Sequence, residues 1–141
     1  MSKHHDLTGE RKDQLLITVD KNGNKTGTAT RDACHKGKGI PHLAFMAFVF
    51  DDKKKIILTK RSEKKSLWAG YWDASVVSHV LPGETVEAAA HRRGKEELGI
   101  EVQFKSVDAF YYFARYNERC ENEYCHVLVG KTQKEVHPNP V

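Results

Sequence analysis

Two acidic residues near the end of the chain have a spacing that suggests metal or acid–base chemistry. Glu121 and Glu123 are separated by one residue and precede a mostly apolar stretch, residues 124–129. In a β-strand, side chains two residues apart point to the same face, so the two carboxylates would lie side by side. Like charges this close are unfavourable unless a cation or a shared proton neutralises one of them. The pair therefore indicates a metal or acid–base site, with a solvated strand end at a sheet edge as the alternative.

A second candidate motif lies between residues 83 and 100, where a Pro-Gly turn precedes an alanine-rich stretch that ends in Glu-Glu-Leu-Gly-Ile. Arg93 and Glu97 are four residues apart, as are Arg92 and Glu96, so on a helix the members of each pair would share a face. Surface ion pairs contribute roughly a few tenths of a kcal/mol and are common without any function. The complete segment, from the turn to the final Gly-Ile, indicates a functional helix more strongly than either ion pair alone.

These residues must be positioned mainly by strands, because most apolar segments of the chain are short. The run 43–50 is continuously apolar, which predicts a central strand buried on both faces. One helix is predicted, with Thr85 as its N-cap and Gly99 directly after its last turn. This pattern predicts an α+β fold, an α/β/α sandwich around a mixed β-sheet. The predicted strands are residues 15–19, 27–30 (after a hairpin turn at 22–24), 43–50, 55–60, 71–77, 107–114 and 123–131.

Length and composition predict one ordinary soluble domain. The chain has 141 residues, of which 39% are hydrophobic and 30% are charged, enough for a single hydrophobic core. No apolar run reaches membrane-spanning length, and residues 1–6 lack the apolar segment of a secretory signal. The three cysteines include no CxxC pair, which fits a reducing compartment. We therefore expect a cytoplasmic protein that does not bind a membrane.

The charge distribution favours a small anionic ligand over a nucleic acid. The formal net charge is +4, and acidic residues are interspersed with the basic ones, so no broad basic surface is predicted. Locally basic stretches occur at residues 36–38 and 60–65. Each is compatible with binding of a small anion or with a solvated loop.

The helix motif resembles the Nudix box, G-x5-E-x7-R-E-U-x-E-E-x-G-U, in which U is aliphatic. Three positions differ: Ser78 replaces the first glycine, Arg93 replaces the first glutamate of the helix and Gly94 replaces the aliphatic residue. In Nudix hydrolases that glutamate is usually a ligand of the catalytic magnesium, and an arginine would repel a dication. The matching positions are Glu84, Arg92, Glu96, Glu97, Gly99 and Ile100.

These differences are typical of one branch of the superfamily, the type I isopentenyl-diphosphate isomerases, which the chain resembles from about residue 15 to residue 131. The shared motifs are H-L-A-F at 42–45, G-Y-W-D-A-S-V-V-S-H at 70–79, R-R-x3-E-E-L-G at 92–99 and E-x-E at 121–123. The resemblance implies a Nudix-type fold and isomerisation of isopentenyl to dimethylallyl diphosphate. It also implies a single domain over residues 1–141, with the C-terminal segment of the family lying beyond Val141.

The resemblance further implies two metal sites and a small diphosphate substrate. The first site takes a divalent ion, and imidazole and carboxylate ligands suit Mn²⁺ or Zn²⁺. The second takes Mg²⁺ near the diphosphate at Glu97, since magnesium prefers carboxylate and phosphate oxygens. The ligands implied for the first site are His35, His42, His79, Glu121 and Glu123. The residues implied to contact the diphosphate are Arg31, Arg61, Lys65 and Arg93.

Moving a double bond requires acid–base groups on opposite sides of a dry pocket. By resemblance, one of these groups is Glu123, helped by a tyrosine that falls at Tyr111 by ungapped count or at Tyr112 by its Y-x-A context. The other is a cysteine in the family. Its position is occupied here by Val77, which carries no proton.

Three residues could replace the missing acid, and three functions stay open. Ser78 would face away from the site, Cys125 would lie beside Glu123 rather than opposite it, and Cys34 would lie in a loop next to a metal ligand.

On the strength of the shared motifs, the chain is interpreted as an isomerase-like enzyme. The alternatives are a Nudix hydrolase that cleaves a nucleoside diphosphate derivative and a catalytically silent paralogue that binds a diphosphate.

Overall fold

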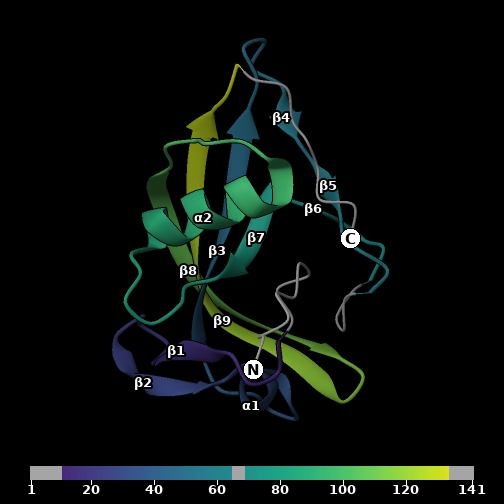
Figure 1. Ribbon diagram of the computed structural model, residues 1–141. Helices are drawn as coiled ribbons and strands as arrows, with labels where there is room; N and C mark the ends of the chain where they lie inside the picture. The colour runs from purple at the N-terminus through teal and green to yellow at the C-terminus, as the bar shows by residue number, and fades with distance from the viewer. Residues whose placement is uncertain (1–10, 65–68, 134–141) are drawn as a thin grey trace, which may run out of the picture.

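The computed structural model describes residues 11–64 and 69–133 and shows a curled sheet with two helices (Figure 1). The order of the strands is β2-β1-β3-β9-β8, and β4 and β7 also pair with β3. β3 and β9 run parallel, whereas the other pairs are antiparallel, so the predicted mixed α+β sheet is confirmed. The elements are β1 (Leu15–Val19), β2 (Lys25–Thr30), α1 (Arg31–His35), β3 (His42–Phe50), β4 (Ile56–Ile57), β5 (Thr59–Lys60), β6 (Trp72–Asp73), β7 (Val76–His79), α2 (Val86–Leu98), β8 (Lys105–Tyr116) and β9 (Arg119–Lys131).

Helix α2 has the ends that its sequence predicts and lies across one face of the sheet (Figure 1). The hydroxyl of Thr85 accepts a hydrogen bond from the backbone N–H of Ala88 at 3.1 Å, which caps the first turn. Gly99 adopts φ 68° and donates its N–H to the carbonyl of Lys95, a left-handed conformation that glycine adopts without a steric penalty. The buried side of α2, which includes Ala89, packs into the main hydrophobic core.

The two faces of the sheet are used differently. On one face, Ala47 pairs with Val76 of β7 and Leu128 of β9, and all three are buried in the core that α2 completes. One residue earlier along β3, Met46 pairs with Val77 on the opposite face, and both are only half-buried. We call this second face, which carries the even-numbered residues of β3, the site face.

The structure corrects several predictions about the strands. The first half of β3 is buried on both faces as predicted, but Met46, Phe48 and Phe50 on the site face are half-buried. The predicted strands 55–60 and 71–77 are each split in two, and their parts belong to different sheets. Ser75 lies at the split, where its hydroxyl accepts from the N–H of Val49 at 2.8 Å and donates to the carbonyl of Ile57. A side chain therefore makes hydrogen bonds here that a continuous ladder would otherwise supply.

The short helix α1 was not predicted from the sequence. Thr30 caps it by accepting from the N–H of Ala33 at 3.2 Å, and it ends at His35. Five residues are too few for a recognisable helical period. No helix within residues 11–64 and 69–133 has the length and apolar content needed to cross a membrane.

Candidate metal centre

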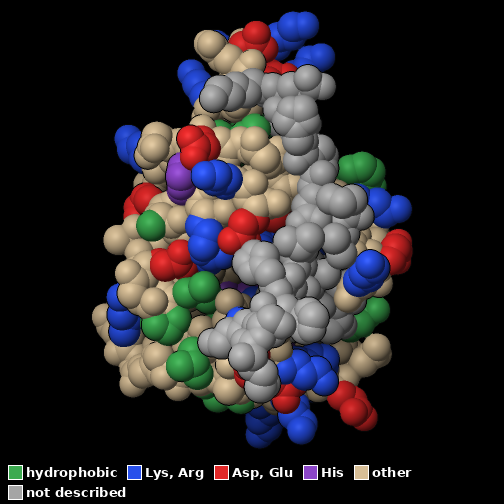
Figure 2. Space-filling view, viewed as in Figure 1, with side chains coloured by type: hydrophobic (Ala, Val, Ile, Leu, Met, Phe, Trp, Pro, Cys, Tyr) green, Lys and Arg blue, Asp and Glu red, His purple; other side chains and the backbone are tan. Residues whose placement is uncertain are grey.

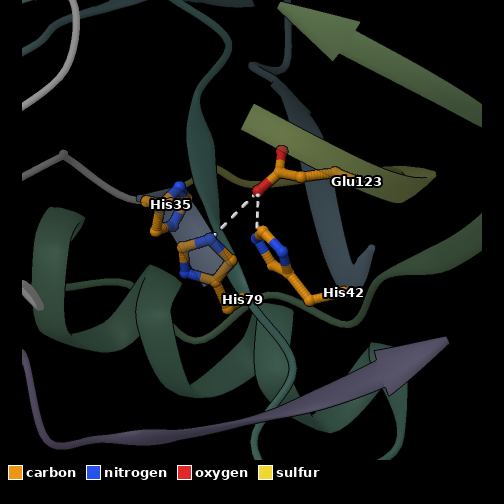
Figure 3. Close-up of side chains that lie close together, drawn as sticks. All are labelled: His35, His42, His79 and Glu123. Carbon is orange, nitrogen blue, oxygen red and sulfur yellow. Dashed lines mark hydrogen bonds and ion pairs between the residues drawn. The ribbon is translucent and has the colours of Figure 1, made fainter. Parts of the chain in front are cut away.

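Four buried side chains converge on one point at the site face (Figure 3). His35, His42, His79 and Glu123 each offer a ligand atom, and these four atoms lie within 4.8 Å of one another. The Nε2 atoms of His42 and His79 both donate to the same carboxylate oxygen of Glu123, at 3.1 and 3.0 Å. Buried groups of this kind need compensation for their lost hydration, and a divalent cation would supply it.

The four ligand candidates come from four segments that meet at the central strand. His35 is the last residue of α1 and His42 is the first residue of β3. His42 pairs directly with Glu123 in the parallel β3–β9 ladder, and His79 ends β7 on the other side of β3, opposite Ala44. Because paired residues share a face of the sheet, the ladder aligns His42, His79 and Glu123. His35 is placed by α1, outside the ladder.

The hydrogen bonds of the imidazole rings suit metal binding. The Nδ1 atom of His35 donates to the carbonyl of Cys120, and that of His42 donates to the carbonyl of Ile40, both at 2.8 Å. Backbone acceptors at Nδ1 orient a ring and direct its Nε2 atom to a metal. The Nδ1 atom of His79 is buried and has no hydrogen-bond partner in the described part of the chain. That nitrogen lies on the side of the ring away from Glu123, so the fit to a divalent ion such as Zn²⁺ or Mn²⁺ rests on the donor set of three imidazoles and one carboxylate.

Electrostatics within the cluster leave two rings neutral and one charged. Burial and the charge of His42 lower the pKa of His35 to about 4, and burial and the charge of Arg31 hold that of His79 well below its usual value. Burial also opposes the charged form of His42, but hydrogen bonds with Cys34 and Glu123 raise its pKa to about 10. A bound dication would take the place of the proton on His42.

Glu121 lies beside the cluster rather than in it. The hydroxyl of Tyr112 donates to Glu121 at 2.6 Å and also contacts Glu123, so it lies between the two carboxylates. The shared face predicted for this pair is therefore confirmed. Burial and the charge of Glu123 raise the pKa of Glu121 to about 7. Burial also opposes ionisation of Glu123, but hydrogen bonds from His42 and His79 keep its pKa well below the usual value.

The structure corrects the assignment of Tyr111 as the tyrosine that assists Glu123. Tyr112 is the residue that pairs with Glu123 across the β8–β9 ladder. Tyr111 is one residue away, so its side chain lies on the opposite face, where its hydroxyl donates to Asn122 at 2.7 Å. The tyrosine that contacts both glutamates is thus the one given by the Y-x-A context, Tyr112, and not the one given by the ungapped count.

Two of the four basic residues expected to bind the diphosphate lie near the cluster. The charge of Arg31 affects the pKa values of His35 and His79, and the charge of Arg61 affects that of Glu121. Arg61 is also ion-paired with Asp73 at 3.3 Å. Lys65, the third, lies outside the described residues.

The fourth basic residue, Arg93, belongs to an ion-pair network on α2. Its buried guanidinium contacts both Glu96 and Glu97, and Arg92 pairs with Glu84 at 2.7 Å. Acidic and basic side chains gather on this face of the molecule (Figure 2). Glu97 is thus paired with Arg93 and is not one of the four converging ligands.

The residues considered for the missing acid lie where strand periodicity predicts. Val77 and Cys125 are both on the site face, because each pairs with an even-numbered residue of β3. Ser78 pairs with Phe45 and faces the α2 side. Burial and the charge of Glu123 raise the pKa of the Cys125 thiol, so it is a weak acid. Cys34 is fully buried.

Sequence reasoning missed the role of Asn122, the residue between the two glutamates. It is buried, accepts from Tyr111 and donates to the carbonyl of Lys38 at 3.2 Å. A polar residue inside a buried strand, pointing away from the carboxylates, was the available signal.

Comparisons with known proteins agree with this geometry. The NUDIX domain family matches residues 40–140. A protein of Photorhabdus laumondii named isopentenyl-diphosphate Delta-isomerase 2 is 44% identical over 124 residues, which cover 87% of this chain and 70% of the relative. The chain belongs to the isopentenyl-diphosphate isomerase branch of the NUDIX family.

Other relatives support this family assignment. Proteins named isopentenyl-diphosphate Delta-isomerase from Halobacterium salinarum and Haloarcula marismortui are 38% and 37% identical over 87% and 96% of this NUDIX chain. The alignments span 60% and 75% of the lengths of these two relatives. Among solved structures, DR0079 of Deinococcus radiodurans matches with a TM-score of 0.70 at 22% identity, covering 90% of this chain and 77% of that one. This last likeness concerns the fold.

Proposed function

We propose that this NUDIX protein is a metal-dependent isopentenyl-diphosphate isomerase whose turnover is limited by Val77. The observation that carries the proposal is the convergence of three imidazoles and Glu123 on one buried point. Half-buried apolar side chains, including Met46 and Val77, continue the same face of the sheet. A charged cluster beside apolar side chains suits a substrate with a diphosphate at one end and a branched hydrocarbon at the other. This activity would place the protein in cytoplasmic isoprenoid biosynthesis.

Two metal sites are part of the proposal. His35, His42, His79 and Glu123 would hold Mn²⁺ or Zn²⁺, with Glu121 as a fifth ligand if Tyr112 moves aside. The bound ion would supply positive charge that lowers the pKa values of neighbouring acids. Mg²⁺ would be held by Glu97 together with the diphosphate oxygens of the substrate. The list of residues proposed to contact the diphosphate is Arg31, Arg61, Lys65 and Arg93.

The proton chemistry would take place at Glu123 and its neighbours. Isomerisation adds a proton to the terminal carbon of the double bond and removes one from the methylene carbon, so the formula of the substrate is unchanged. Tyr112 hydrogen-bonds to both carboxylates and can hand a proton from Glu121 to Glu123. Val77 offers no partner acid or base. A positioned acid or base typically contributes about 10²–10⁴-fold to a rate, so we expect slow isomerisation.

The structure does not favour the hydrolase alternative. Nudix-type hydrolysis would use the carboxylates of Glu96 and Glu97 for metal binding, and Arg93 contacts both of them. Hydrolysis of that kind would need both carboxylates to be released from Arg93, whereas the Mg²⁺ proposed above, bridged by the diphosphate, would need only Glu97.

The test is to incubate the full chain with isopentenyl diphosphate, Mg²⁺ and Mn²⁺ in D₂O and to follow dimethylallyl diphosphate and deuterium uptake by NMR. We expect slow product formation by the wild type and a rate at least about 10-fold higher in Val77→Cys. Glu123→Gln should form no product. The matched control is Val107→Cys, a valine exposed on β8, which should leave the rate unchanged. Release of phosphate, or of a nucleoside monophosphate from a nucleotide panel, would select the hydrolase. Diphosphate binding with no product from the wild type or Val77→Cys would leave the silent paralogue.

A further inference from the structure

Loop 36–41 connects two of the proposed metal ligands, so its position decides where both imidazoles lie. His35 precedes the loop and His42 follows it. The ring of His42 also donates its Nδ1 proton to the carbonyl of Ile40 within the loop. A displacement of the loop would therefore move the backbone at both ligands and rotate one ring.

The loop lies against the beginning of β9. The N–H of Gly37 donates to the carbonyl of Glu118 at 3.0 Å, and that of Ile40 donates to the carbonyl of Cys34 at 3.1 Å. Gly39 adopts φ +65°, and a Cβ atom there would lie 2.5 Å from the carbonyl oxygen of Cys34 and 2.6 Å from the sulfur of Cys120. Packing this close leaves the loop little freedom to adjust on its own.

Asn122 ties this loop to the sheet from the face opposite the metal ligands. Its side-chain N–H donates to the carbonyl of Lys38 at 3.2 Å, and its side-chain oxygen accepts from the hydroxyl of Tyr111 at 2.7 Å. The side chain is buried, and its neighbours Glu121 and Glu123 point to the site face. The bonds thus run from β8 through β9 to the loop, and none of these groups contacts the metal point directly.

We infer that Asn122 is a positioning residue of the metal centre and that Tyr111 acts through it. The side-chain amide of Asn122 holds the backbone of the loop at Lys38. With the loop fixed, the carbonyl of Ile40 stays at the ring of His42. The end of α1 also stays in place, so His35 keeps its bond to the carbonyl of Cys120. Tyr111 fixes which way the amide faces, because a hydroxyl donor requires the oxygen on its side. The inference rests on the proposed metal function.

Cobalt(II) is the probe for the test, because its d–d absorption reports coordination geometry as well as occupancy. The metal-free full chain would be titrated as wild type, Asn122→Ala and Tyr111→Phe. Loss of an outer-shell partner typically weakens a metal site about 10- to 100-fold, and we expect this for Asn122→Ala together with an altered d–d spectrum. Tyr111→Phe, which removes one neutral hydrogen bond, should weaken binding about 3- to 10-fold. The double variant should match Asn122→Ala, since Tyr111 acts through the amide.

A matched control and a metal-free measurement separate the possible failures. Asn22→Ala is the control, because this exposed residue uses its backbone N–H to contact Asp20, and it should bind Co²⁺ like the wild type. Amide hydrogen exchange of the metal-free protein should be faster at Gly39 and Ile40 in Asn122→Ala. If the wild type binds Co²⁺ but Asn122→Ala keeps its affinity and spectrum, the inference is overturned and the metal site stands. If the wild type binds no Co²⁺, the proposed function fails and the inference falls with it.

Should Asn122→Ala fail to fold, Tyr111→Phe retains the amide and carries the test. Unchanged affinity and spectrum in that variant would then overturn the inference.

Discussion

Replacement of Gly94 by alanine should stabilise the protein, although glycine stands at a motif position in α2. A Cβ atom at Gly94 would lie 3.6 Å from Phe104 and 3.9 Å from Val76, which is ordinary van der Waals contact. Alanine is favoured over glycine within a helix by about 1 kcal/mol, and a buried methyl group contributes roughly another 0.8 kcal/mol. The expected gain is therefore about 1–2 kcal/mol, or about 3–8 °C in Tm for a domain of this size.

The same substitution at Gly130 is a matched control, because this glycine meets the other side of Phe104. A Cβ atom there would lie 2.4 Å from Val102, 3.0 Å from the carbonyl oxygen of Gln103 and 3.0 Å from Phe104. The contact with Val102 is too close for a real Cβ, the other two are tighter than most, and the backbone oxygen cannot rotate away. Overpacking of this kind typically costs about 1–3 kcal/mol, so Gly130→Ala should destabilise.

Urea unfolding followed by circular dichroism measures both changes, and calorimetry gives Tm independently. The two variants should shift the unfolding midpoint in opposite directions, with the slope against urea unchanged. A lower midpoint for Gly94→Ala would refute the packing of α2 against Phe104.

Three further predictions concern the site and the helix that flanks it. The pKa of His42 is raised to about 10, so in the metal-free protein at pH 8 this ring is protonated. Metal binding should therefore release about one proton, which calorimetry in buffers of different ionisation heat measures. A heat of binding that does not depend on the buffer would contradict this. Tyr112→Phe removes a hydrogen bond that lowers the pKa of Glu121, so that pKa should rise above about 7 in an NMR titration of the carboxyl carbon, and a fall would show that the bond is absent. Thr85→Ala removes the N-cap of α2 and should cost about 1 kcal/mol in urea unfolding, whereas an unchanged midpoint would mean that the cap contributes nothing.

Local physics decided the features that the sequence predicted correctly. Thr85 and Gly99 delimit α2 because a capping hydroxyl and a left-handed glycine act within a few residues of themselves. Glu121 and Glu123 share a face because strand geometry repeats every two residues. The same two-residue period places the side chain of Ser78 on the α2 side of the sheet, away from the site face. None of these conclusions requires knowledge of which strands are neighbours.

Tertiary structure alone decided how those faces are combined. Periodicity assigns a side chain to a face but leaves the register between strands open, and the turn after Tyr116 sets the register that brings Tyr112, rather than Tyr111, opposite Glu123. Hydrogen bonds from Ser75 divided two predicted strands, which no propensity encodes. His35, His42 and His79 converge because α1, β3 and β7 meet at the centre of one sheet, and these contacts form only when distant segments pack together. The motifs thus determined which residues could hold a metal. The pairing of β3 with β7 and β9 determined that four of these residues converge. The hydroxyl of Tyr112 lies between Glu121 and Glu123, so Glu121 stays outside this group.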